Sequence, residues 1–61
     1  KMEDFEKWLD EMTRYEVYHH RHEKEFGTRK GSREHLIRAG VFKAVLDKYR
    51  ELKSIETEKQ D

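Results

Sequence analysis

The chain is short, highly charged and electrically balanced. It has 61 residues, 46% of them charged, with fourteen basic and fourteen acidic side chains and no cysteine. This length fits one small domain, residues 1–61, and the balance excludes a global electrostatic attraction to nucleic acid or to an anionic membrane. Without cysteine or a long apolar run, we expect neither disulfides nor a membrane span, and we expect a cytoplasmic location.

The first part of the chain predicts one long helix. Its large side chains recur at alternating intervals of three and four residues, which is the spacing of one helical face. Glu3 and Asp4 suit the positive end of a helix dipole. Gly27 directly follows the last member of the face, a position typical of a left-handed glycine that ends a helix. We predict a helix over about residues 3–26, with a packing face made of Phe5, Trp8, Met12, Tyr15, His19, His22 and Phe26.

A polar connection and a second helix follow. Residues 27–32 contain two glycines and no apolar side chain, which is typical of a loop. The hydroxyl of Ser32 suits the N-cap of the next helix, with Glu34 in its first turn. We predict a second helix over about residues 33–56 and a frayed polar tail over residues 57–61. The predicted fold is therefore all-α, a two-helix antiparallel hairpin.

The second predicted helix carries more apolar surface than one neighbour can cover. At about 100° per residue, most of its apolar side chains form one stripe, and Phe42 with Leu46 widens the stripe on one side. Gly40 is expected to let a bulky side chain such as Trp8 approach closely. Hairpins of this size rarely bury enough surface alone, so we expect a homodimer packed as a four-helix bundle, with docking on another protein as the alternative. The residues expected at the interface are Ile37, Val41, Phe42, Val45, Leu46, Tyr49 and Leu52.

Histidines are concentrated in one segment of the first helix. Three of the four lie within four positions, and Glu16 precedes His19 and His20 by three and four residues. Nitrogen and oxygen ligands therefore share helix faces, with a spacing that suits zinc. The simpler interpretation is that His19 and His22 fill packing positions and that His20 is solvated. The candidate metal ligands are Glu16, His19, His20, His22 and Glu23.

A second candidate site surrounds the predicted loop. Basic side chains gather at the loop and at the start of the second helix, where free backbone donors and the helix dipole also favour an anion. Nucleic-acid phosphates or an acidic protein surface would suit this chemistry, and the alternative is that the charges only solvate the loop. The candidate anion-binding residues are Arg29, Lys30, Arg33, His35 and Arg38.

Catalysis is not expected. Ser32 and Ser54 are the only serines, and neither combines with a base and an orienting acid into a convincing nucleophile. We expect a non-enzymatic protein–protein interaction or adaptor module that acts as a homodimer and needs no cofactor. Two alternatives stay open, namely a small regulator that binds nucleic-acid phosphates through the basic loop, and a metal-binding protein that uses the histidine cluster.

Overall fold

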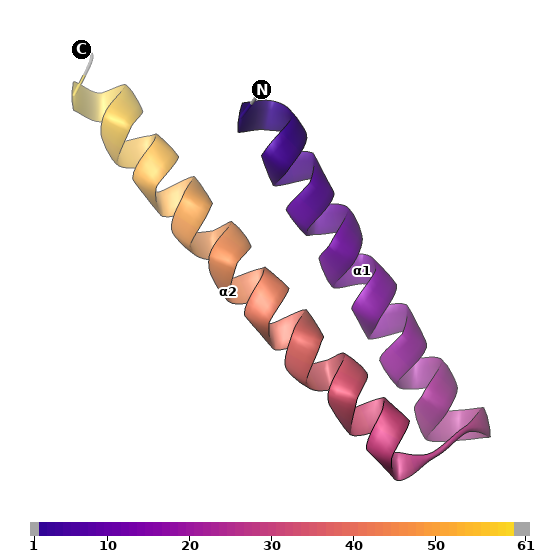
Figure 1. The fold of residues 1–61 in the computed structure, drawn as a ribbon. Coiled ribbons are helices and arrows are strands. Elements are labelled where there is room, and N and C mark those ends of the chain that lie inside the picture. The colour runs from indigo at the N-terminus through magenta and orange to yellow at the C-terminus, as the bar shows by residue number, and fades with distance from the viewer. Residues whose placement is uncertain (1, 60–61) are drawn as a thin grey trace.

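Two antiparallel helices make up the fold. The computed structural model describes the backbone of residues 2–59 and the side chains of residues 3–57. Helix α1 spans Met2–Phe26 and helix α2 spans Arg29–Lys59. The helices lie side by side, with the start of α1 and the end of α2 at one end of the hairpin and the turn at the other (Figure 1). The prediction of an all-helical hairpin is confirmed. Within the described residues, neither helix has the apolar stretch that a bilayer crossing requires.

The turn is shorter than predicted, because α2 begins earlier. Only Gly27 and Thr28 lie between the two helices. The hydroxyl of Thr28 accepts a hydrogen bond from the N–H of Gly31 at 3.0 Å, and its carbonyl accepts one from the N–H of Ser32 at 3.0 Å. This is the geometry of an N-cap. Thr28 therefore caps α2, and the prediction of a loop over residues 27–32 with Ser32 as the cap is wrong.

Gly27 ends α1 without a left-handed backbone. No glycine in the described part of the chain has a positive φ, so that prediction is also wrong. Instead, the Glu23 carboxylate folds over the turn and accepts a hydrogen bond from the N–H of Thr28 at 2.8 Å. A Cβ at residue 27 would collide with this carboxylate. Glycine therefore leaves space for the side chain that holds the turn.

Helix α2 continues through most of the segment that was predicted to fray. The hydroxyl of Thr57 donates to the carbonyl of Lys53 at 2.9 Å, and the helix reaches Lys59. Lysine and glutamate have good intrinsic helix propensity, so this segment does not need apolar contacts to be helical. The tail prediction is wrong for residues 57–59, and residues 60–61 lie outside the described residues.

The helices meet along a narrow line of residues spaced alternately three and four apart, as in a coiled coil. Its buried apolar members are Leu9, Ala39 and Leu46, which are 2%, 5% and 1% exposed. All the other members are buried or half-buried, and many of them are polar. We call this line the seam; it consists of Glu6, Leu9, Thr13, Glu16, His20 and Glu23 on α1, and of Ser32, His35, Ala39, Phe42, Leu46 and Tyr49 on α2.

The predicted packing face of α1 is not the seam. At about 100° per residue, the face of large side chains lies roughly 90° around α1 from the seam. Trp8 remains 46% exposed and Phe26 73% exposed. Gly40 is exposed, and a Cβ added to it would meet nothing within 4 Å, so it does not receive Trp8, whose ring packs against Phe42 instead. The predicted face is thus real as a helical stripe but points away from the line of closest packing.

Candidate interaction surface

One side of the hairpin presents large apolar side chains from both helices. On each helix these side chains form a stripe that lies roughly 90° around the helix axis from the seam. Viewed along each helix from its N-terminal end, the rotation from the seam to the stripe has the same direction. Because the helices are antiparallel, equal rotations bring both stripes to the same side of the hairpin. We call this surface the apolar face; it consists of Phe5, Trp8, Met12 and Tyr15 on α1, and of Val41, Phe42, Val45, Tyr49 and Leu52 on α2.

Aromatic ring contacts across the helices support this arrangement. The rings of Phe5 and Tyr49 meet edge to face with centroids 5.7 Å apart, and those of Trp8 and Phe42 do the same at 5.7 Å. Such contacts favour a defined orientation of the rings. They close one side of the seam with aromatic groups whose outer surfaces stay in solvent.

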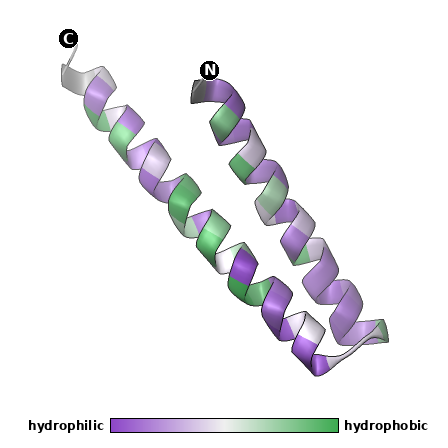
Figure 2. Ribbon diagram, in the orientation of Figure 1, coloured by the Kyte–Doolittle hydropathy of each residue, from purple (hydrophilic) through white to green (hydrophobic). Residues whose placement is uncertain are grey.

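The apolar face is largely uncovered. Val41, Val45 and Leu52 are 59%, 42% and 55% exposed. Hydrophobic positions are common along α2, whereas α1 is mostly hydrophilic from its middle toward the turn (Figure 2). A contiguous exposed patch of this kind is typical of an interaction surface.

The predicted interface residues divide into three groups. Five of them, all on α2, belong to the apolar face. Leu46 lies in the seam and is covered within the hairpin. Ile37 is 59% exposed but lies about 180° around α2 from Leu46, on its outer side. The contribution of α1 to the surface was missed, although its regular spacing of large side chains was the available signal.

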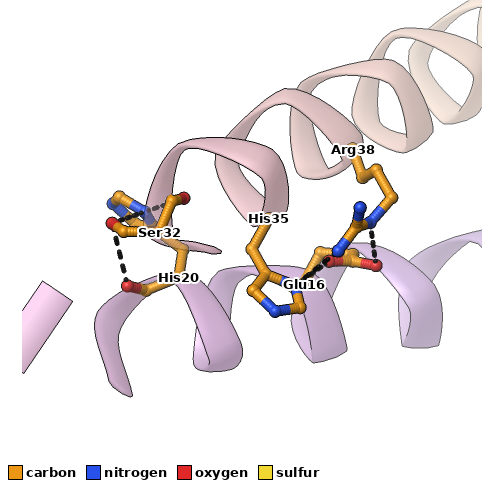
Figure 3. Close-up of polar contacts among 5 residues, drawn as sticks. All are labelled: Glu16, His20, Ser32, His35 and Arg38. Carbon is orange, nitrogen blue, oxygen red and sulfur yellow. Dashed lines mark hydrogen bonds and ion pairs between the residues drawn. The ribbon is translucent and has the colours of Figure 1, made fainter. Parts of the chain in front are cut away.

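A buried carboxylate forms a polar layer in the seam. Glu16 is 4% exposed. Its Oε2 atom lies 2.6 Å from Nδ1 of His35, and its Oε1 accepts a hydrogen bond from Nε of Arg38 at 2.9 Å (Figure 3). Because a carboxylate only accepts, Nδ1 of His35 carries the donated proton. Burial alone would raise the pKa of Glu16, but the hydrogen bonds from His35 and Arg38 outweigh it and hold this pKa below its ordinary value.

A second polar layer lies nearer the turn. Nδ1 of His20 donates to the carbonyl of Ser32 at 2.9 Å, and the Ser32 hydroxyl donates to the carbonyl of His20 at 3.3 Å (Figure 3). Ser32 is 7% exposed. These bonds join α1 to α2 and give the buried Ser32 hydroxyl and the half-buried His20 ring their hydrogen-bond partners. The prediction that His20 is simply solvated is therefore wrong.

A third polar contact lies toward the chain ends. The carboxylate of Glu6 accepts hydrogen bonds from Arg50 at 2.9 Å and from Lys53 at 3.3 Å. These bonds hold the pKa of Glu6 below its ordinary value. Charged side chains therefore bracket the apolar part of the seam.

The candidate metal ligands do not converge. Glu16, His20 and Glu23 already bond to other groups, as described above. His19 stacks against His35 with ring centroids 5.3 Å apart, and His22 is exposed. In the described part of the chain, no group of three or more potential ligands is placed to hold a metal ion.

The candidate anion-binding residues separate into two groups. His35 and Arg38 turn toward Glu16. The other three line a hollow beside the turn, together with two residues of α1 that the sequence did not single out for this role. We call this site the basic hollow; it is lined by His20, Lys24, Gly27, Arg29, Lys30, Ser32, Arg33 and Leu36.

Comparison with known proteins gives no relative for this chain. No protein-family model matches it, and neither the curated proteins nor the solved structures contain a match. Its function therefore has to be inferred from its own residues.

Proposed function

We propose that this chain is a non-enzymatic protein–protein interaction module that acts as a homodimer, with the apolar faces of two copies packed together as a four-helix bundle. The observation that carries the proposal is the apolar face itself. The two helices contribute to one continuous surface, and their own packing leaves it open. Exposed apolar area of this kind favours association because its burial removes it from water.

The total surface area supports a partner of similar size. The chain exposes 5308 Å², whereas a compact monomer of 7.6 kDa would expose about 4,300 Å². The hairpin is elongated, with extents of 50 × 16 × 12 Å, and this shape leaves the additional area in solvent. A second hairpin packed along the apolar face would remove part of that area from water.

The composition of the face supports a second copy as that partner. All its members are uncharged, and aromatic residues and methionine, which are enriched in interfaces, make up much of it. The chain has a formal net charge of zero, so two copies do not repel each other strongly. In a two-fold dimer the same patch meets itself, which suits a face built from both helices.

The proposal is tested by sedimentation equilibrium from about 1 µM to about 500 µM protein. We expect the mass to rise to twice 7.6 kDa as concentration increases. Val45→Lys, which places a charge within the apolar face, should prevent this. A single well-folded monomer at the highest concentration would rule out the homodimer.

Ile37→Lys is the matched control. It exchanges an exposed branched aliphatic side chain for the same charge on the same helix, but on the outer side of α2. This variant should still dimerise. Equal loss of dimer in both variants would show that association does not use the apolar face.

A further inference from the structure

The basic hollow brings together cations from both helices. Lys24 comes from the last turn of α1, and Arg29, Lys30 and Arg33 come from the first turns of α2. With their neighbours they surround a cavity of about 760 Å³ that contains no acidic lining residue. The short turn is what places these four side chains around one space.

These four cations are not neutralised within the hairpin. None of them forms an ion pair with another residue in the described part of the chain. Glu23, the carboxylate that folds over the turn, is engaged with the backbone N–H of Thr28. The uncompensated positive charge therefore faces the hollow.

Most other exposed cations along the helices are paired, and in the described part of the chain Lys7 and Arg21 are the exceptions. Arg14 lies 3.1 Å from Asp10, and Lys43 lies 2.8 Å from Asp47. Lys48 is also paired, with Glu51. Because the paired Arg14 lies between Arg21 and Lys7 on α1, the described part of the hairpin lacks a continuous track of free positive charge leading away from the turn, as a long nucleic acid would need.

We propose that the basic hollow binds a compact anion that carries two or more linked phosphate groups. Lysine and arginine side chains bind phosphate oxygens through charge-assisted hydrogen bonds. No phenylalanine, tyrosine or tryptophan lines the hollow, and the ring of His20 is hydrogen-bonded to Ser32, so recognition acts on the phosphates rather than by stacking a base. This inference goes beyond the homodimer, because each hairpin carries its own complete hollow.

The test is a titration of the full chain with tripolyphosphate at low salt, followed through backbone amide resonances by NMR. We expect saturable shifts concentrated at Lys24 and at residues 27–33, with much weaker binding of orthophosphate. Replacing Lys24, Arg29 and Arg33 together by glutamine should weaken tripolyphosphate binding by roughly tenfold or more. Circular dichroism should show unchanged helix content, since all three side chains are exposed.

The matched control removes three paired cations elsewhere, in Arg14→Gln, Lys43→Gln and Lys48→Gln together. It lowers the net charge equally but should bind tripolyphosphate as the parent chain does. Equal weakening in both triple variants, or shifts spread along both helices, would overturn the proposal. Affinity for a single-stranded oligonucleotide that keeps rising with its length would also overturn it, in favour of a polymer ligand. None of these outcomes depends on dimerisation.

Discussion

The seam and the apolar face lie on adjacent sides of the same two helices and share Phe42 and Tyr49 at their border, yet they use different chemistry. The seam contains few apolar residues, and within the described residues no buried side-chain nitrogen or oxygen lacks a hydrogen-bond partner. The apolar face contains large side chains that remain in water. Hydrogen bonds are directional but contribute little net stability, whereas burial of apolar area is non-directional and strong. The contacts that orient the helices are therefore largely separate from the surface that would stabilise an assembly.

The largest effect on stability is expected at the apolar centre of the seam. Leu46→Ala removes a fully buried side chain and should lower the free energy of unfolding by about 2–5 kcal/mol. Thermal melts followed by circular dichroism would measure this at several protein concentrations. A substitution on the apolar face should lower stability mainly where the chain is dimeric. The loss from Leu46→Ala should be present even where the chain is monomeric.

A second variant keeps this prediction testable if Leu46→Ala does not fold. Leu46→Met conserves the side-chain volume and should cost less than about 1.5 kcal/mol. If Leu46→Ala changed stability no more than Leu46→Met does, the seam would not be the core of the hairpin.

A smaller loss is expected at the buried polar layer. Glu16→Gln keeps the size of the side chain but removes the charge that accepts from His35 and Arg38, which should cost about 1–3 kcal/mol. Urea unfolding at neutral pH would measure the difference. Glu11→Gln, at an exposed position of α1, should stay within about 0.5 kcal/mol of the parent chain. Similar costs for the two variants would contradict a stabilising role of the layer.

Acid should weaken the seam because it protonates carboxylates that accept hydrogen bonds from cationic side chains. The folded-state pKa values of Glu6 and Glu16 lie below the ordinary value of 4.5. The stability they contribute is therefore fully present above about pH 4.5 and is lost as the pH falls through the folded-state values. Urea unfolding at about pH 6 and about pH 3 should show this loss, and the Glu6→Gln, Glu16→Gln double variant should show less of it. An equal loss in the double variant would assign the acid sensitivity to other groups.

The smallest effect is a gain at a position outside both surfaces. Gly40 lies in the interior of α2, and a Cβ there would meet nothing within 4 Å. Gly40→Ala should therefore raise the free energy of unfolding by about 0.5–1 kcal/mol, because alanine loses less backbone freedom on folding. The midpoint of thermal unfolding measures this, and the concentration dependence of the mass should not change. A loss of stability would mean that the open space at residue 40 is used in the assembly.

The sequence predicted the two helices well because helix formation depends on local spacing and propensity. It did not predict the seam, because two sets of α1 residues share the same spacing. The large side chains near Trp8 gave the stronger hydrophobic signal, while Glu16 gained its partners only through folding, from a histidine nineteen residues away. Neighbouring positions in a sequence do not reveal such long-range pairing.

The start of α2 and the basic site were mispredicted for related reasons. Thr28 and Ser32 are both able to cap a helix, and only the contact of Ser32 with His20 shows that its hydroxyl serves the packing of the helices. Likewise, His35 and Arg38 adjoin the basic loop in sequence, but one helical turn directs them to Glu16. Which basic residues line the hollow therefore depends on the path of the turn, and the spacing of the sequence alone did not indicate it.

The Glu16 layer also fixes the register of the hairpin. If α1 slid along α2 by one helical turn, about 5.4 Å, this carboxylate would face Ala39 or Ser32 instead of His35. A buried charge stripped of its counter-ion is strongly destabilising, so shifted alignments are heavily disfavoured. The side chains of the apolar face are thereby held at fixed positions relative to one another. A partner that docked there would meet a rigid surface.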